Sequence, residues 1–265
     1  MVVPNIAGFE HHLDAGHSLI PRYFRAPPGP SHGGQRMKFG VVVFPGSNCD
    51  EDMCFVLEHV MGQKVERLWH KEHDLKGCDM IVLPGGFSYG DYLRSGAIAR
   101  FSPIMQEVAA FAKKGGPVFG VCNGFQVLCE AHLLPGALLH NEGQTFLCKN
   151  VFIRAENRTT LLTNAVREKP LMIPIAHGEG RYYADADTLK ALNDNRQILF
   201  RYCDSEGRLR DDANPNGSLE NIAGVCNEGR NVFGMMPHPE RAADERLGNT
   251  DGKALFTSLL QGVLA

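Results

Sequence analysis

A cysteine between two glycines is the residue with the clearest chemistry in this chain of 265 residues. The motif Gly120-Val-Cys122-Asn-Gly124 directly follows an apolar run at 117–121 and opens a helical pattern at 123–132. Gly-x-Cys-x-Gly is the thiol counterpart of the Gly-x-Ser-x-Gly nucleophile elbow, in which the glycines let crowded backbones pass. A helix N-terminus beneath the sulfur favours thiolate, the reactive form. We predict that Cys122 is a nucleophile and that the other seven cysteines are structural.

Two backbone segments could stabilise negative charge beside that sulfur. The N–H group of Asn123 follows the nucleophile, where an elbow provides half of an oxyanion hole. The loop Pro84-Gly-Gly-Phe87 follows the apolar run 79–83, and a glycine pair at the end of a strand lets N–H groups face a ligand. Pro-Gly-Gly also forms ordinary turns, so the motif alone does not indicate an oxyanion hole. The predicted nucleophile elbow one strand away favours that interpretation. We expect Gly86, Phe87 and Asn123 to be the donors.

A histidine between two prolines offers the base that a thiol nucleophile needs. In Pro237-His238-Pro239-Glu240 the prolines restrict the backbone, and residues two apart in an extended segment face the same side. We predict that His238 is the general base and that Glu240 orients its imidazole. A rival pair, His177 and Glu179, lies in a Gly-rich loop. We interpret that pair as lining the substrate pocket, with a catalytic base or a plain turn as alternatives.

Two further sets of residues leave their roles open. The loop 45–48 either caps the following helix through Asn48 or contacts the substrate. His70 and His73 stand among acidic residues, but their spacing and polar context predict a solvated surface rather than a metal site. No Cys/His set in the sequence has zinc-ligand spacing, so we predict no metal.

The elements that must position these residues alternate along the chain. Short apolar runs occur at 39–44, 65–69, 79–83 and 117–121, with helical patterns at about 50–60, 92–114 and 123–132 between them. Later runs lie at 150–154, 171–175, 197–203, 221–227 and 231–236, before a helical pattern at 252–263. This order predicts a doubly wound α/β fold, with a mostly parallel sheet, helices on both faces and antiparallel additions. Ligands of such sheets bind beyond the carboxyl ends of strands, here after residues 44, 83 and 121.

The composition is typical of a globular protein and excludes several other classes of protein. Apolar residues make up 43% and charged residues 22%, with a net charge of −3 and no basic run, which argues against binding to nucleic acid or to a membrane. No apolar stretch reaches the ~20 residues of a membrane helix. Eight scattered cysteines and the absence of a signal peptide predict free thiols in the cytoplasm. We expect residues 1–36 to be a poorly ordered, non-catalytic extension and 37–265 to form the catalytic domain.

The combined motifs resemble the class I, or triad, glutamine amidotransferases, whose fold is flavodoxin-like. Four blocks narrow the resemblance to the family of glutaminase subunits of phosphoribosylformylglycinamidine synthase, and the likeness spans about residues 37–265. The blocks are Phe44-Pro-Gly-Ser-Asn-Cys-Asp50, Leu83-Pro-Gly-Gly-Phe-Ser-Tyr-Gly-Asp-Tyr-Leu-Arg94, Gly120-Val-Cys-Asn-Gly-Phe-Gln126 and Ala176-His-Gly-Glu-Gly-Arg181.

The resemblance implies an enzyme that hydrolyses L-glutamine through a thioester on Cys122, with His238 and Glu240 completing the triad. Its ammonia would pass to a separate synthetase subunit, which uses ATP and Mg²⁺ to convert formylglycinamide ribonucleotide to formylglycinamidine ribonucleotide in purine biosynthesis. A small third subunit usually bridges the two. This chain itself would need no cofactor, because its sequence holds no Gly-x-x-x-x-Gly-Lys-Ser/Thr phosphate loop.

Further residues are assigned to the substrate pocket and to a docking surface for the synthetase. For the substrate pocket we name Gln126, His177 and Glu179, although Gln126 could equally pack in the core. For docking to the synthetase we name Tyr89, Asp91, Tyr92 and Arg94. The alternatives to this function are a class I glutaminase of another synthase, a related cysteine hydrolase of the same fold superfamily, and a partner module whose site has decayed.

Overall fold

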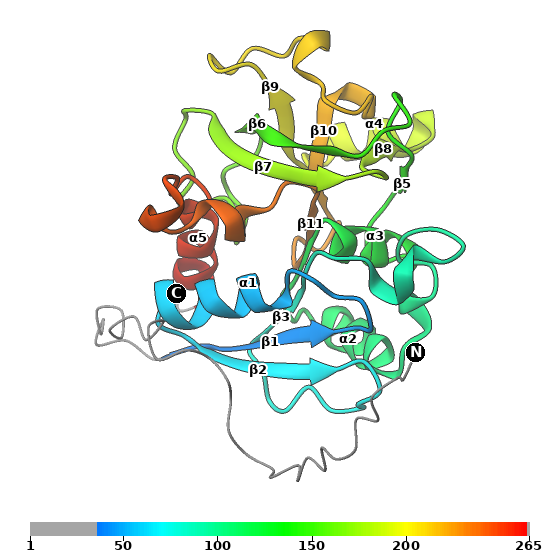
Figure 1. Cartoon of the computed structure of the whole chain (residues 1–265), viewed down its shortest axis with the longest axis vertical. Coiled ribbons are helices and arrows are strands. Elements are labelled where there is room, and N and C mark those ends of the chain that lie inside the picture. Colours follow the sequence, from blue (N-terminus) through cyan, green and yellow to red (C-terminus); the bar gives the residue numbers. More distant parts are fainter. Residues whose placement is uncertain (1–35, 264–265) are drawn as a thin grey trace, which may run out of the picture.

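Residues 36–263 are described by the computed structural model, which is shown in Figure 1. The N-terminal extension expected over 1–36 therefore lies outside the described residues, except for Arg36. Within the described part of the chain, no helix is both long and apolar enough to span a membrane.

The strands and helices alternate through the first half of the chain as the apolar pattern predicts. The first strands are β1 (Lys38–Val43), β2 (Lys64–Trp69), β3 (Met80–Leu83) and β4 (Val118–Val121). The later ones are β5 (Ala137–Leu139), β6 (Leu147–Ala155), β7 (Leu171–His177), β8 (Arg181–Tyr183), β9 (Ile198–Cys203), β10 (Ile222–Cys226) and β11 (Val232–Met235). The helices are α1 (Asp50–Phe55), α2 (Pro103–Lys113), α3 (Asn123–Glu130), α4 (Ala186–Asp194) and α5 (Lys253–Val263).

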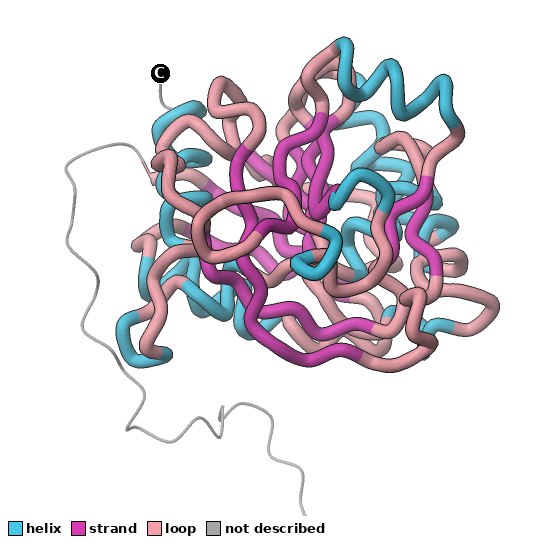
Figure 2. Tube along the Cα trace, turned by 90° about the horizontal axis from the view of Figure 1, so that it is seen from above, coloured by secondary structure: helices cyan, strands magenta, loops and turns pink. Residues whose placement is uncertain are grey.

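One large sheet organises the described residues. Its strand order is β2-β1-β3-β4-β11-β10-β9-β6-β7. The strands from β2 to β11 pair in parallel, whereas β10, β9, β6 and β7 pair antiparallel. In Figure 2 the strands cross the middle of the molecule and helices lie to either side. The predicted doubly wound α/β fold with antiparallel additions is confirmed.

The apolar pattern misses three elements and overextends one. It does not predict helix α4 or strands β5 and β8, which pair with each other. The helix expected over 92–114 is wrong in its first half, because α2 begins only at Pro103 after an extended Ser102. Before it, Tyr89, Asp91 and Leu93 adopt left-handed backbone angles, with φ of 55°, 53° and 71°, that no α-helix contains.

The elbow after β4 depends on a glycine that cannot be replaced without a clash. A Cβ atom on Gly124 would lie 1.9 Å from the carbonyl oxygen of Leu83, in the neighbouring strand β3. Helix α3 therefore passes directly over the end of β3, and the loops after β3 and β4 are held side by side. This contact sets the frame for the residues with predicted chemistry.

We predict that Gly124→Ala lowers the free energy of unfolding by about 1–3 kcal/mol, the usual effect of overpacking. Because the helix must move away from Leu83, the predicted nucleophile Cys122 at its start should be displaced and lose reactivity as well. Thermal unfolding measures the first effect, and the rate of Cys122 alkylation, followed by mass spectrometry, measures the second. Gly143→Ala is the matched control, since its Cβ would meet nothing nearer than 3.7 Å and the residue should tolerate the change. An unaltered melting temperature in Gly124→Ala would contradict the proposed contact.

Candidate active site

The predicted nucleophile lies in a strained turn between β4 and α3. Cys122 has φ 51° and ψ −107°, a combination that costs on the order of 1–3 kcal/mol and is concentrated at functional sites. The backbone is held there by a 2.8 Å hydrogen bond from Cys122 N to the Met235 carbonyl of β11. The thiol donates to the Ala176 carbonyl at 3.7 Å, and the residue is 5% exposed. The strand, the turn and the helix thus present the sulfur as the elbow motif predicts.

A buried imidazole and carboxylate follow β11. His238 Nδ1 lies 2.6 Å from Glu240 Oε1, and both residues are 1% exposed. The segment is fixed to the edge strand β7 by a 2.8 Å bond from His238 N to the Pro174 carbonyl. A Cβ on Gly85 would lie 2.6 Å from His238 Cε1, so the ring packs against the glycine loop after β3. Its Nε2 has no hydrogen-bond partner among the described residues and is available to accept a proton.

The surroundings of His238 favour its charged form. Burial alone lowers the pKa of an imidazole, but the adjacent Glu240 carboxylate raises it, and the Cys122 and Cys49 thiols add to that effect. The net result is that the pKa of His238 lies well above its ordinary value. A buried histidine of this kind can take the proton of Cys122 and hold it during attack.

One of the three expected oxyanion donors is already engaged. The N–H of Phe87 donates to the Gly46 carbonyl at 3.0 Å, because loop 45–48 crosses behind loop 84–87. Phe87 is therefore not available as a donor in this structure, and Gly86 and Asn123 remain the candidates. Asn48 does not cap α1 either, since Cys49 occupies the N-cap position. The loop 45–48 thus holds the loop 84–87 in place through backbone contacts.

A cavity of about 160 Å³ opens beside the thiol. It brings together most of the residues expected at the site, from the loops after β3, β4 and β7. The lining residues are Gly86, Phe87, Asp91, Ser95, Cys122, Gln126, His140, Phe146, Ala176, His177, Gly178 and Glu179. A strained thiol, a buried imidazole–carboxylate pair and a small cavity at the carboxyl ends of parallel strands are the arrangement predicted for attack on a carbonyl carbon.

Comparisons with known proteins identify the family. A family profile described as the CobB/CobQ-like glutamine amidotransferase domain matches residues 36–253. A Koribacter versatilis protein, phosphoribosylformylglycinamidine synthase subunit PurQ, is 57% identical over 225 residues, which cover 84% of this chain and 97% of the relative. The Synechocystis PurQ protein is 58% identical over 221 residues, 83% of this chain and 99% of the relative. The chain belongs to the PurQ family of glutamine amidotransferases.

Solved structures agree with this assignment. A chain of the Thermotoga maritima PurLQS structure matches with a TM-score of 0.76 and 43% identity, covering 86% of this chain and 100% of that one. Another glutamine amidotransferase of Thermotoga maritima, at 14% identity and a TM-score of 0.55, shares the fold, with 87% of this chain and 99% of that chain covered. The chain is thus an amidotransferase enzyme, and its class I fold is shared beyond the PurQ family.

The rival histidine of the Gly-rich loop is held neutral. Burial, and then the charge of His238, lower the pKa of His177 to about 4. Its Nδ1 lies 3.1 Å from Asn141 Oδ1, and the ring packs so closely on Gly180 that a Cβ there would lie 2.2 Å away. These contacts fit a wall of the substrate pocket better than a base that must carry a proton.

The amide of Gln126 holds the pocket together. Its Nε2 donates to the Glu179 backbone carbonyl at 2.6 Å, and its Oε1 accepts from Asn123 Nδ2 at 3.0 Å. Asn123 Oδ1 in turn accepts from Ser88 N at 3.1 Å. This network ties the loops after β3, β4 and β7 into one wall, so Gln126 acts at the pocket mainly through its neighbours.

The four residues expected to dock the synthetase lie in different surroundings. Tyr89 is hydrogen-bonded inward, to His70 at 2.6 Å. Arg94 pairs with Glu130 at 2.6 Å, and Asp91 faces the cavity. Tyr92 alone of the four presents a largely exposed apolar side chain, 75% accessible, and it adjoins Leu93 at 91%, which the motifs do not single out.

One expectation about the surface is wrong. The sequence context predicts that His70 is solvated together with His73, but His70 is only 4% exposed. It follows strand β2 directly, its N–H donates to the Val43 carbonyl of β1, and its ring packs edge-on against Tyr89. The pairing of β2 with β1 draws the residue inward, which the polar sequence around it does not indicate.

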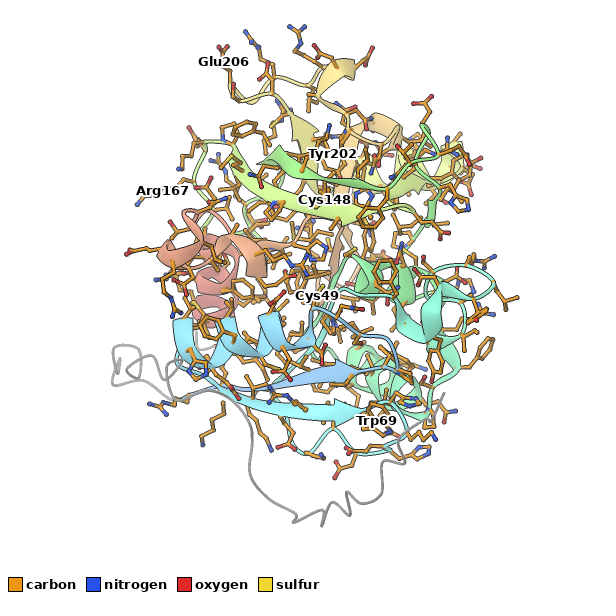
Figure 3. All side chains as sticks on the ribbon, in the orientation of Figure 1. Cys49, Trp69, Cys148, Arg167, Tyr202 and Glu206 are labelled. Carbon is orange, nitrogen blue, oxygen red and sulfur yellow. The ribbon has the colours of Figure 1, made fainter. Side chains whose placement is uncertain are left out.

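A second cysteine stands beside the predicted triad. Ligand atoms of Cys49, His238 and Glu240 all lie within 4.8 Å of one another, a spacing that could suit a metal. However, the Arg241 guanidinium donates to Cys49 Sγ at 3.1 Å, and its positive charge disfavours a cation there. Figure 3 labels Cys49 in the middle of the molecule. No motif places Cys49 in this cluster, because it lies far from His238 and Glu240 in the chain.

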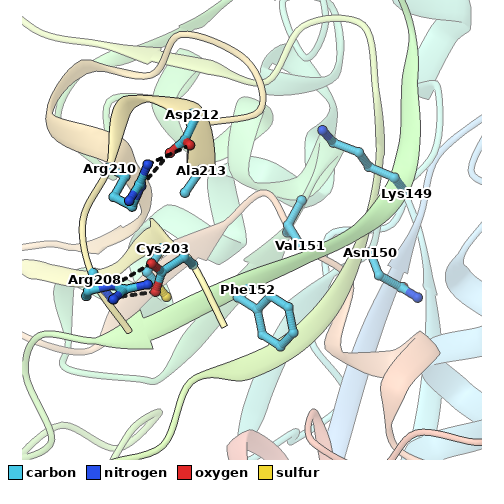
Figure 4. A pocket seen from close by; sticks show the side chains of 10 residues that line it. Lys149, Asn150, Val151, Phe152, Cys203, Arg208, Arg210, Asp212 and Ala213 are labelled. Atoms are coloured by element: carbon cyan, nitrogen blue, oxygen red, sulfur yellow. Dashed lines mark hydrogen bonds and ion pairs between the residues drawn. The ribbon is translucent and has the colours of Figure 1, made fainter. Parts of the chain in front are cut away.

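A larger cavity, of about 370 Å³, lies between β6 and the segment after β9 (Figure 4). Its two arginines are neutralised by carboxylates, with Arg208 bonded to Asp204 at 2.8 Å and Arg210 to Asp212 at 2.9 Å. Burial raises the pKa of the Cys203 thiol there to about 11, which keeps it unreactive. The predicted site residues therefore line the smaller cavity, beside Cys122, and not the larger one.

The acid Asp91 provides a test of the site's electrostatics. Burial raises its pKa to about 6, and the Glu179 charge adds to the effect while a hydrogen bond with Ser95 opposes it. Because the folded pKa exceeds the unfolded value, stability is lost as pH rises from about 4 through 6. Asp91→Asn stays neutral, so we expect it to melt higher than the unmodified chain at pH 8, with the gap vanishing near pH 4.

The expected gap is at most about 2–4 °C, the shift that ~1 kcal/mol produces in a chain of this size, because Asp91 is partly solvated. Asparagine also tolerates the left-handed backbone of this position. Thermal unfolding across pH measures the effect, with the exposed Asp187→Asn as control. A variant that is less stable than the parent at pH 8 would show that the carboxylate stabilises the fold.

Proposed function

We propose that this chain is the glutaminase subunit of a phosphoribosylformylglycinamidine synthase, hydrolysing L-glutamine to glutamate and ammonia. The observation that carries the proposal is the strained Cys122 elbow beside the buried His238–Glu240 pair, in a chain of the PurQ family. A thiol, an imidazole and a carboxylate in this order suit the hydrolysis of a carboxamide through an acyl-enzyme.

In the first half of the reaction, His238 Nε2 accepts the thiol proton and the Cys122 sulfur attacks the side-chain carbonyl carbon of glutamine. The electron pair of the carbonyl moves to oxygen, which the N–H groups of Gly86 and Asn123 stabilise. Each such donor is worth about 3–4 kcal/mol. Glu240 keeps the imidazole in the tautomer that exposes Nε2 and stabilises the imidazolium that forms.

The tetrahedral intermediate then collapses. The C–N bond breaks, His238 gives its proton to the leaving nitrogen, and ammonia departs, leaving a γ-glutamyl thioester on Cys122. His238 next takes a proton from water, whose oxygen attacks the thioester carbon. The C–S bond breaks, the proton returns to sulfur, and glutamate is released. No cofactor takes part in these steps.

The ammonia would pass to a synthetase subunit that uses ATP and Mg²⁺ to convert formylglycinamide ribonucleotide to its amidine, with a small third subunit bridging the two. The Thermotoga maritima structure named PurLQS supports an assembly of this kind. Exposed apolar side chains near the cavity support docking there, since Phe87 and Phe146 stack with ring centroids 6.4 Å apart and both line the cavity. The free cysteines accord with a cytoplasmic enzyme.

Cys122→Ala should abolish the use of glutamine, because no other described cysteine lies at an elbow. The assembled complex should still make the amidine from added ammonium, since that step belongs to the synthetase. Glutamate release and product formation are measured with each nitrogen source, and Cys148→Ala, at an exposed strand position, is the control. Loss of both activities would refute the division of labour, and product from another acceptor alone would favour a different synthase.

His238→Ala should cost roughly 10⁵–10⁶-fold in kcat, and Glu240→Gln about 10–100 times less, as for base and orienting residues in other triads. The reason is that the imidazole moves the proton, whereas Glu240 only fixes and stabilises it. Glutamate release at saturating glutamine measures both variants. A larger loss for Glu240→Gln than for His238→Ala would remove Glu240 from its orienting role.

A further inference from the structure

A cysteine side chain lies beside the predicted base and its carboxylate. A Cβ atom on Gly85 would lie 2.6 Å from His238 Cε1 and 3.1 Å from Cys49 Sγ, so the sulfur and the edge of the ring meet at the loop after β3. Cys49 Sγ also lies within 4.8 Å of a ring nitrogen of His238 and of a carboxylate oxygen of Glu240. Cys49 is thus buried against the His238–Glu240 pair.

The sulfur of Cys49 is held by an arginine that follows this pair in the chain. Arg241 Nη2 donates to Cys49 Sγ at 3.1 Å, and Arg241 Nε donates to Asp52 Oδ2 at 3.1 Å. These bonds join the turn 239–242 to the start of α1, which lies next to it in Figure 1. Cys49 N donates to the Gly85 carbonyl at 3.3 Å, which fixes the backbone of the same residue. Arg241 and Gly85 therefore leave the thiol little freedom to move.

We propose that Cys49 is a positioning residue for the hydrolysis of glutamine and that Arg241 acts through it. The guanidinium fixes the sulfur, and the sulfur holds the His238 ring in the orientation that presents Nε2 to the thiol of Cys122. The proposal rests on the proposed function, since it takes His238 as the base of that reaction. Glu240 holds the ring at one atom, Nδ1, about which the ring can still turn. A second contact, at Cε1, prevents that movement.

The orientation of the ring matters because proton transfer depends on it. His238 Nε2 is buried and has no hydrogen-bond partner within the described residues, so no bond at that atom holds the ring in place. A general base must lie within hydrogen-bond reach of its proton, and a displacement of about 1 Å can cost on the order of 100-fold in rate. Removing the sulfur of Cys49 opens a space beside Cε1 into which the ring can turn.

The same contact has an electrostatic consequence. The titratable and charged groups near the imidazole come from the turn after β11, the elbow, the start of α1 and the end of β7, and they are Glu240, Arg241, Cys122, Cys49 and His177. Among them, the Cys49 thiol adds to the raised pKa of His238, so its loss should lower that pKa. In the proposed reaction the imidazolium gives its proton to the leaving nitrogen. The fall of kcat at alkaline pH should therefore follow the pKa of His238.

The test measures glutamate release by the complex with the synthetase, for the parent chain, Cys49→Ala and Cys49→Ser. Cys49→Ala should lower kcat roughly 10–100-fold with KM within about 3-fold, because only the placement of the base changes. The alkaline limb of its kcat profile should also move to lower pH. Cys49→Ser keeps an acceptor for Arg241 and should stay within about 5-fold of the parent in kcat. Cys54→Ala, which removes another buried sulfur from the hydrophobic core, is the matched control and should leave kcat and its pH profile unchanged.

A double-variant cycle tests whether Arg241 acts through Cys49. Arg241→Gln alone should lower kcat roughly 3–10-fold, and in the Cys49→Ala background its effect should shrink to within about 2-fold, because the donor then has no sulfur to hold. Losses that multiply would show that Arg241 acts independently of Cys49 and would overturn that part of the proposal. Arg210→Gln, which loses its bond to Asp212 at the larger cavity, is the control.

Alkylation of Cys122 by iodoacetamide separates this proposal from the proposed function, because it needs the base but not glutamine. Its rate, followed by mass spectrometry, should fall in Cys49→Ala and be restored in Cys49→Ser. A Cys49→Ala chain with the parent's kcat or the parent's alkylation rate overturns the positioning role. If that variant does not fold, Arg241→Gln tests the same contact from a partly exposed side chain, and a parental kcat there overturns the proposal. If the parent complex releases no glutamate while alkylation still depends on Cys49, the proposed function fails and the positioning role stands.

Discussion

The close approach of Gly124 to the Leu83 carbonyl is the constraint on which the rest of the site depends. A side chain on Gly124 would occupy the space of that oxygen, at 1.9 Å. Only with glycine can α3 begin directly over the end of β3, so that the loops after β3 and β4 share one edge of the sheet. The strained angles of Cys122 follow, because the chain must turn from strand to helix within one residue.

Strands from both the parallel and the antiparallel part of the sheet position Cys122 and His238. Strand β11 pairs in parallel with β4 and delivers His238 to the same edge as Cys122. The edge strand β7 then accepts the His238 N–H at Pro174 and the Cys122 thiol at Ala176. His238 and Cys122 are therefore both bonded to β7, the strand at the antiparallel edge of the sheet. The late strands are as much a part of the site as the elbow.

Features with a local signal could be predicted from the sequence, and those that depend on distant pairing could not. Glycines around Cys122 and prolines around His238 carry their geometry within a few residues, and the alternation of runs predicted the sheet. The engagement of the Phe87 N–H depends on a loop some forty residues earlier in the chain, at Gly46. The burial of His70 depends on strand pairing, and the late start of α2 on left-handed residues that are not glycines. None of these three features is marked by a periodic pattern of residues in the sequence.

Two buried histidines near one thiol illustrate how the fold assigns a single proton acceptor. Both lose hydration, which alone would lower both pKa values. His238 is compensated by Glu240 at 2.6 Å and keeps a pKa well above its ordinary value, whereas His177 faces only the neutral Asn141 and falls to about 4. The charge of His238 itself contributes to that fall. Of these two imidazoles, only His238 has surroundings that stabilise a proton leaving Cys122.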